Sequence, residues 1–451
     1  MFAYNAKLAF KSLNDRPSLT ILMVAAIAIG LGLFMTMLTL SHQASKIPIP
    51  HISEQIHLVQ LDNREVDAEE AERFYEMVDL TYQDTENLLN MDIAGVQQSL
   101  AWNTHGILNV EEQDIQPLRS SLVATNHAFF SMFDVPFLYG NGWDKAADQY
   151  GQSVIVLSKA SNDYLFGGTN SVGQQIRLNT QVLTVVGVLD DWFLAQKFYD
   201  RSYSQARPDQ ALIPSNLAFN NELPRNARFD CWSTTSNPRK FMTNFLTELK
   251  TSECAWITFW AKLPSNAKED YQTLLGQYID SQSNLGRFPR ENQFFLTNIN
   301  EQIALISGTN GRQQMLGMIS YMFFAVCLIN AVSILLAKFM RRTKEVSLRR
   351  ALGAKKRTIL QQHLIEVVFI GIIGGLIGIV FTYVGLQGML RVSLYSSDYT
   401  RTAIDLMPYH QMDWEMIMMA FSVSVGCTLL VGLYPIWRIC NVSPASQLKA
   451  Q

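Results

Sequence analysis

A stretch of basic residues between two long apolar runs is the part of the chain best equipped to bind charged groups. Between Lys338 and Leu360, nine Lys or Arg residues stand against one acid, Glu345. Such cations attract lipid headgroups or the carboxylates of a partner protein. Nucleic acid is disfavoured as a partner, because the stretch is tethered between two candidate membrane spans. Basic loops beside spans stay on the cytoplasmic side, so we predict that 338–362 is a cytoplasmic loop.

The sequence lacks the residue patterns of catalysis and metal binding. It contains no GxxxxGK[ST] loop for nucleotide phosphates, no GxSxG or HExxH motif and no CxxC pair. Its seven His residues do not fall at the spacing of metal ligands. We therefore expect no catalytic residue, metal ion or cofactor in this chain, and a membrane-anchored enzyme is disfavoured.

Four apolar stretches are each long enough to cross a bilayer, which takes about 20 residues. They lie at about 19–41, 315–337, 364–387 and 415–436. The first has basic residues before it, as a signal peptide does, but its apolar run exceeds a usual signal core and no small-x-small cleavage site follows. We therefore predict a retained span. With 338–362 inside, the order of spans puts 42–312 outside and both termini inside.

Charge is distributed along the chain as this topology requires. Residues 42–312 hold 20 basic and 32 acidic side chains, whereas 1–18, 338–362 and 437–451 together hold 14 basic ones. Such segregation is typical of a membrane protein with a positive inner face. Glu366 lies about a turn inside the third apolar stretch and is expected to reach the inner interface by snorkelling. With no Asp, Lys or Arg in the middle of a span, a proton-driven carrier is disfavoured, and another subunit is expected to drive this one.

The expected fold class is four transmembrane helices plus an α+β domain inserted between the first and second spans. Residues 1–18 have the amphipathic pattern of a helix that lies in the inner interface or covers neighbouring protein. Runs such as SVIVLS at 153–158 and VLTVVGVL at 182–189 predict strands of the external domain. Weak periodicity over 192–250 predicts a loop-rich subdomain at about 192–300. Strand character returns at Cys254–Leu263, and a helix is expected at about 269–283.

Two sets of residues predict packing. Cys231 and Cys254 are the only cysteines of the external domain, and they form a disulfide or remain buried free thiols. The third span has overlapping GxxxG spacing, which lets helices approach closely within one subunit or between two. The glycines that give this spacing are Gly371, Gly374, Gly375 and Gly378.

The stretch KEVSLRRALGAKKRTILQQHLIE at 344–366 resembles the cytoplasmic loop of the FtsX/MacB-type permeases of ABC transporters. The closing YPIWRICNVSPASQLKA at 434–450 resembles the end of these permeases. In the external domain, NHAFFSMFDVPFLYGNGW at 126–143 follows the pattern of the MacB-like periplasmic core. The resemblance covers most of the chain and is weakest from about 192 to 300.

This resemblance implies a permease subunit in the inner membrane of a bacterium, with a periplasmic domain at 42–312 and an FtsX-like permease domain at 313–451. The implied partners are a second permease copy or a homologous permease, and a separate ABC ATPase subunit that binds ATP and Mg. A periplasmic adaptor and an outer-membrane channel are further implied partners. No cofactor is implied for this chain itself.

The loop that would couple the chain to the ATPase lies within 338–362. In the resemblance, Val346, Ala351 and Leu352 face a groove on the ATPase, and Gly353 ends the coupling helix with a positive φ. Alternatively, the basic loop only anchors the chain to lipid headgroups. The full set of implied coupling residues is Glu345, Val346, Arg349, Arg350, Ala351, Leu352, Gly353 and Ala354.

The leading functional prediction is mechanotransmission, in which ATP hydrolysis moves the periplasmic domain and so exports a substrate or extracts it from the membrane. One alternative is an FtsX-like signalling module that activates periplasmic cell-wall hydrolases. Another is lipoprotein release of the LolC/LolE kind. The sequence identifies no substrate.

Overall fold

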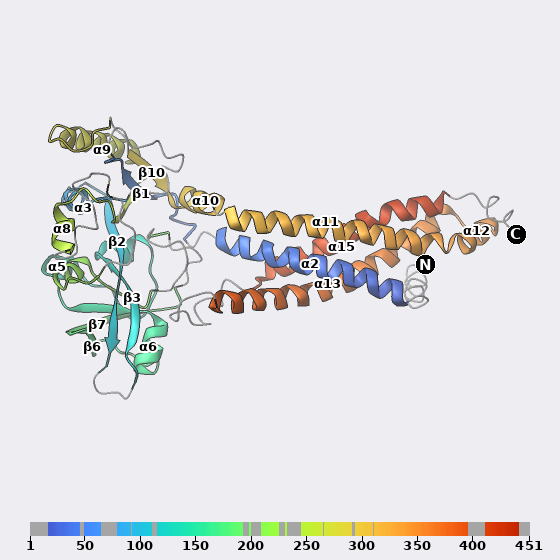
Figure 1. Cartoon of the computed structure of the whole chain (residues 1–451), viewed down its shortest axis with the longest axis horizontal. Helices are drawn as coiled ribbons and strands as arrows, with labels where there is room; N and C mark the ends of the chain where they lie inside the picture. The colour runs from blue at the N-terminus through green and yellow to red at the C-terminus, as the bar shows by residue number, and fades with distance from the viewer. Residues whose placement is uncertain are drawn as a thin grey trace. The chain divides into compact units, whose positions relative to one another are not determined.

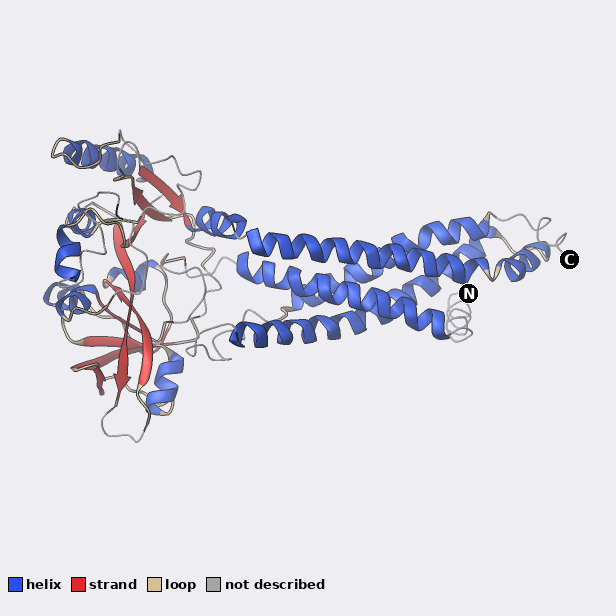
Figure 2. Ribbon diagram, viewed as in Figure 1, coloured by secondary structure: helices blue, strands red, loops and turns tan. Residues whose placement is uncertain are grey.

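The computed structural model divides the chain into two compact units. The helical unit comprises Met1–Ala44 and Asn310–Gln451, and the sheet unit comprises Ser45–Thr309. Among the described residues, strands occur only in the sheet unit (Figure 2). The predicted fold class, four long apolar helices with an inserted α+β domain, is confirmed. The structure describes residues 17–45, 49–64, 79–91, 93–110, 115–192, 198–199, 209–224, 231, 245–264, 266–290, 294–309, 311–395 and 411–441.

Long helices packed side by side make up the described part of the helical unit (Figure 1). Four segments are long and apolar enough to span a membrane, and the third starts earlier than the predicted 364–387 because the polar residues before it still form helix. Most of the predicted helix at 1–18 lies outside the described residues. The helices are α2 (Pro17–Ser45), α11 (Gly311–Met340), α12 (Thr343–Ala351), α13 (Lys356–Tyr395) and α15 (Trp414–Cys440). The candidate spans are Pro17–Gln43, Gln314–Met340, Lys356–Val392 and Trp414–Cys440.

The four glycines of the GxxxG pattern face two different neighbours of α13 inside the chain. A Cβ atom added at Gly371 would lie 2.2 Å from Oγ1 of Thr428 on α15. A Cβ atom at Gly378 would lie 2.7 Å from the side chain of Leu31 on α2. Gly375 likewise faces α15 and Gly374 faces α2. In this structure the pattern therefore packs α13 against helices of the same chain, with one side of the helix for each neighbour.

A single mixed sheet organises the other unit. Its strand order is β10-β1-β9-β2-β3-β8-β5-β7-β4, and β6 pairs with β2 and β7. Most neighbours are antiparallel, while β3–β8 and β5–β7 are parallel. The strands are β1 (Ile56–Leu61), β2 (Gln97–Asn109), β3 (Leu118–Thr125), β4 (Phe137–Gly140), β5 (Val154–Leu157), β6 (Gln175–Leu178), β7 (Gln181–Leu189), β8 (Ala211–Pro214), β9 (Thr258–Lys262) and β10 (Phe294–Asn298).

Hydrophobic residues cover both faces of this sheet. On β1, Leu58 belongs to one buried cluster and its neighbour Val59 to another, because successive strand residues point to opposite faces. Short helices pack over these faces. They are α3 (Tyr82–Leu89), α4 (Ala128–Met132), α5 (Lys145–Tyr150), α6 (Lys159–Phe166), α7 (Ser215–Asn220), α8 (Phe245–Thr251), α9 (Lys268–Ser283) and α10 (Ile299–Thr309).

The described parts of 192–300 do not form the separate loop-rich subdomain that their weak periodicity predicts. Strand β8 lies between β3 and β5, and β9 lies between β1 and β2, so both belong to the common sheet. Strand β8 has only four residues, too few for a clear periodic signal, whereas β9 lies within the strand predicted at 254–263. Their positions depend on pairing with strands far away in the sequence.

Candidate functional site

The predicted coupling loop folds as the short helix α12, between the second and third candidate spans. The hydroxyl of Thr343 donates a hydrogen bond of 2.8 Å to the carbonyl of Met340 at its start. At its end, the N–H groups of Gly353 and Ala354 donate to the carbonyls of Arg350 and Arg349. This is the Schellman pattern, which needs a left-handed residue after the helix. Gly353 has a φ of 96°, as the sequence predicts.

One side of α12 is buried in the helical unit. Val346 is 6% exposed and belongs to the same buried cluster as Phe339 of α11 and Ile359 of α13. The prediction that Val346 faces a partner is therefore wrong. The side chain points back at the spans, because the turns at both ends of α12 fold this side against them. Ala354 is partly buried against the same cluster.

The opposite side of α12 is exposed and apolar. Leu348 is 55% exposed and Leu352 is 80% exposed, and Ala351 beside them is also exposed. Leu348 lies two residues from Val346, about 200° around the helix, which explains their opposite environments. We call Leu348, Ala351 and Leu352 the outer face of α12. Leu348 was missed by the sequence interpretation, although its i, i+4 spacing to Leu352 was a usable signal.

Both arginines of α12 have partners inside the chain. Arg349 forms an ion pair of 2.6 Å with Glu345 and donates a hydrogen bond of 3.0 Å to Oε1 of Gln362 on α13. Arg350 donates a hydrogen bond of 3.1 Å to the carbonyl of Cys440 at the end of α15. A cation at this position also suits the negative end of α15. The family resemblance implies that these two arginines pair with acids of the ATPase; in the structure they fasten α12 to α13 and α15.

A buried ion pair that the sequence interpretation missed lies beside α12. Nζ of Lys338 on α11 is 2.7 Å from Oε1 of Glu366 on α13, and both side chains are 1% exposed. Glu366 therefore does not snorkel to the interface as predicted. Helix α13 begins at Lys356, so Glu366 lies almost three turns inside it, and Lys338 provides a nearer partner than the interface does.

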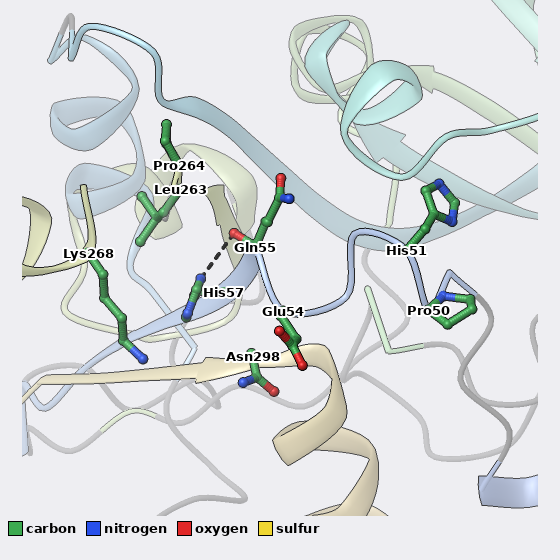
Figure 3. A pocket seen from close by; sticks show the side chains of 9 residues that line it. All are labelled: Pro50, His51, Glu54, Gln55, His57, Leu263, Pro264, Lys268 and Asn298. Atoms are coloured by element: carbon green, nitrogen blue, oxygen red, sulfur yellow. Dashed lines mark hydrogen bonds between the residues drawn. The ribbon is translucent and has the colours of Figure 1, made fainter. Parts of the chain in front are cut away.

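The sheet unit contains a cavity where the chain enters β1 (Figure 3). His57 is one of the lining residues, with Nδ1 3.1 Å from the carbonyl oxygen of Gln55. Burial lowers the pKa of the His57 imidazole, and the nearby ammonium of Lys268 lowers it further. The lining mixes cationic, anionic and neutral groups, and His57 already has its backbone partner, so the cavity does not select one class of ligand. It is lined by Pro50, His51, Glu54, Gln55, His57, Leu263, Pro264, Lys268 and Asn298.

Two further points concern bound groups and cross-links. Cys231 and Cys254 form a disulfide in the structure, with their Cα atoms 4.2 Å apart. Within the part of the chain that the structure describes, no group of three or more His, Cys, Asp or Glu side chains is placed to hold a metal ion.

Two family models match the chain in sequence order. The MacB-like periplasmic core domain matches residues 20–252, which is more than half of the 451 residues. The FtsX-like permease C-terminal domain matches residues 317–444. The second match includes α12 and the three helices around it.

Individual proteins show the same similarity. The macrolide export ATP-binding/permease protein MacB of Wolinella succinogenes is 23% identical over 448 residues, which cover 99% of this chain and 60% of the relative. The pyoverdine export ATP-binding/permease protein PvdT of Pseudomonas syringae pv. tomato is 25% identical over 335 residues, which cover 74% of this chain and 43% of the relative. The chain thus spans 60% or less of the length of these two relatives.

Among solved structures, the periplasmic region of MacB from Actinobacillus actinomycetemcomitans is 14% identical to this chain. The match has a TM-score of 0.35 and covers 58% of this chain and 97% of that one. The family assignment depends on the two family models and their order along the chain. By these matches and its four apolar helices, the chain belongs to the FtsX/MacB-type permeases of ABC transporters and is a multi-pass inner-membrane protein with a periplasmic domain.

Proposed function

We propose that this permease passes motion from a partner ATPase to its periplasmic domain, and so drives export or membrane extraction of a substrate. The observation that carries the proposal is the outer face of α12. Two large apolar side chains, Leu348 and Leu352, are exposed one helical turn apart, and charged residues surround them. Exposed apolar side chains rimmed by polar ones are typical of protein contact sites. Lipid headgroups would favour the basic residues but give no reason for this apolar face.

The inner side of α12 supports transmission of a force applied to the outer face. Val346 packs in a cluster shared by α11 and α13, Arg349 is hydrogen bonded to α13, and Arg350 to α15. Helix α11 then continues for 30 residues to Gly311, a length of about 45 Å. The next helix along the chain, α10, belongs to the sheet unit. One continuous helix therefore leads along the chain from the C-terminal end of the periplasmic domain to α12, and a moving helix requires no open pore.

The energy source in this proposal is ATP bound with Mg²⁺ by the partner ATPase. A second permease copy or a homologous permease completes the membrane part, and an adaptor with an outer-membrane channel is a further expected partner. The two similar relatives are named for export of macrolides and of pyoverdine. These compounds are chemically unrelated while the identities are almost equal, so we propose no substrate class.

The test is to place a charge on the outer face of α12. Leu352→Asp would bury an unpaired carboxylate in an apolar contact, and we expect it to weaken binding of the co-purified ATPase by about tenfold or more, where one decade is about 1.4 kcal/mol. The matched control is Leu285→Asp, because Leu285 is 74% exposed and lies in the sheet unit. Binding is measured by titration in lipid nanodiscs, together with stimulated ATP hydrolysis.

The two variants must differ for the proposal to stand. If Leu352→Asp binds the ATPase and stimulates hydrolysis as Leu285→Asp does, α12 is a lipid anchor and not a docking element. This substitution is a sharper test than reversal of Arg349 and Arg350, because both arginines have partners within the chain. Their reversal would disturb the fold of α12 as well as any contact.

A further inference from the structure

A small polar network joins three helices inside the helical unit. Nζ of Lys338 on α11 is 2.7 Å from Glu366 on α13 and 3.2 Å from Oγ1 of Thr20 on α2. Oε2 of Glu366 is also 3.4 Å from Nδ1 of His363, one turn earlier on α13. All four residues are at least nine-tenths buried. The ring of His363 packs at 4.6 Å against that of Phe339 on α11.

Stability alone is a poor explanation for this pair. Removing two charges from water is costly, and a well-packed apolar pair of similar size is often as stable as a buried ion pair or more so. Inside a membrane protein, ionisable residues are correspondingly rare and usually functional. What an ion pair supplies and an apolar contact does not is a specific partner, since displacing the two groups leaves each buried charge without its counter-ion.

The position of the pair in the chain shows which helices this specific pairing holds together. Lys338 lies five residues before α12 begins, and Glu366 lies ten residues after α13 begins. The pair therefore links α11 and α13, the two helices that flank α12. Many other contacts of α13 with α2 and α15 are between glycines and small or apolar side chains, which hold helices close but define their axial position weakly. The buried hydroxyls of Thr36 on α2 and Ser424 on α15 also donate hydrogen bonds to carbonyls of α13, but these bonds do not involve α11. A slide of α11 against α13 by one turn, about 5.4 Å, would separate Lys338 from Glu366 completely.

We propose that Lys338 and Glu366 are positioning residues, a clamp that keeps α11, α13 and α2 in one register so that force on α12 moves the three helices together. The part concerning force rests on the proposed function of α12. The part concerning register does not, and it is measured without any partner.

The register test uses spin labels at Met340 on α11 and Leu360 on α13, which are 37% and 38% exposed. The chain, in lipid nanodiscs, should give a narrow distance distribution. Lys338→Met and Glu366→Gln should each broaden it, and the exchanged pair Lys338→Glu/Glu366→Lys should narrow it again. The apolar double variant Lys338→Met/Glu366→Leu should melt near the temperature of the unmodified chain and still give a broad distribution. That combination separates register from stability.

The coupling test measures periplasmic-domain movement per ATP hydrolysed in the complex with the co-purified ATPase. Each single variant should lose about two- to thirtyfold, the range expected for residues in a coupling network, while ATPase affinity stays unchanged because the outer face of α12 is intact. Lys159→Met is the matched control, because it removes an exposed ion pair with Asp191 in the sheet unit. It should change neither readout.

Two results would overturn the clamp. One is an apolar double variant with a narrow distribution and full coupling, since the pair would then contribute packing only. The other is an exchanged pair no better than the single variants. If instead the register results are as expected while Leu352→Asp leaves ATPase binding unchanged, the clamp stands and the proposed function of α12 falls.

Discussion

The two units of this chain bury charge in different ways. The described residues include six buried Asp, Glu, Lys or Arg side chains, four in the sheet unit and two in the helical unit. Those of the sheet unit are Asp62, Arg64, Asp84 and Asp209, and those of the helical unit are Lys338 and Glu366. The sheet unit therefore buries charged side chains in several places, whereas the described part of the helical unit buries a single Lys–Glu pair.

In the sheet unit these networks join elements that are distant in sequence. Arg287 lies 2.9 Å from Asp84 and 2.6 Å from Glu253. Asp84 also accepts hydrogen bonds of 2.6 Å from the hydroxyls of Tyr278 and Thr81. One carboxylate thus ties α3 to α9 and to the loop after α9. Such a pair is tolerated in the interior because further hydrogen bonds satisfy its remaining atoms.

In the helical unit, close contact takes the place of these networks. Apolar side chains gain little by leaving lipid for a protein interior, so helices in a bilayer associate mainly through van der Waals packing. Gly371 and Gly375 admit α15, and Gly374 and Gly378 admit α2. Apart from the Lys338–Glu366 pair, the comparison predicts that loss of a charge is most harmful in the sheet unit and that added volume is most harmful in the helical unit.

The largest effect should come from breaking the sheet-unit network at Arg287. Arg287→Met leaves the buried carboxylate of Asp84 without its cation, and such a loss typically costs about 3–5 kcal/mol. The measurement is denaturant unfolding of the sheet unit in the full chain, followed by tryptophan fluorescence. Lys159→Met is the control, because its ion pairs with Asp190 and Asp191 are exposed and such pairs contribute little. Equal stability of the two variants would refute the comparison for this unit.

The next effect should come from added volume in the helical unit. Gly371→Leu must push α15 away, because even a Cβ atom there would lie 2.2 Å from Thr428. Overpacking of this kind typically costs about 1–3 kcal/mol. Gly388→Leu on the same helix is the matched control, since a Cβ atom there meets nothing within 4 Å. The melting temperature in nanodiscs should fall for the first variant only. A similar fall in both would mean that these glycines serve helix flexibility rather than packing.

Local signals predicted much of this structure. The spans follow from apolar length alone. Helix α6 follows from Ser158 and Gly167, which cap its two ends as their residue types predict. The positive φ of Gly353 could be predicted in the same way. Each of these features depends on a few neighbouring residues, so the sequence displays it directly.

Features that depend on distant partners were not predictable in this way. Val346 has the residue type of a contact surface, and only the fold of the two flanking helices shows that it is buried. Lys338 and Glu366 are 28 residues apart, and their pairing requires α13 to begin at Lys356 rather than at the start of the apolar stretch. Strand β8 depends in the same way on β3 and β5, its neighbours from far along the chain.

The smallest expected effect is a pH dependence of the stability of the sheet unit. Burial lowers the pKa of His57 and of His105, and Arg119 adds to the shift of His105. The unfolded chain takes up protons at these imidazoles below about pH 6.5, where the folded unit still resists them. The unfolded state therefore binds more protons as the pH falls through this range, and the sheet unit loses stability below about pH 6.5 while these two groups leave it unchanged at higher pH.

His57→Gln should flatten this decline in part, and adding His105→Gln should flatten it further. The measurement is the unfolding free energy of the sheet unit at pH 5.5 and at pH 7.5. The difference between these two free energies should be a fraction of the loss for Arg287→Met, because burial disfavours only the protonated, charged form of each imidazole. A decline of equal slope in the double variant would show that these two imidazoles do not cause the pH dependence.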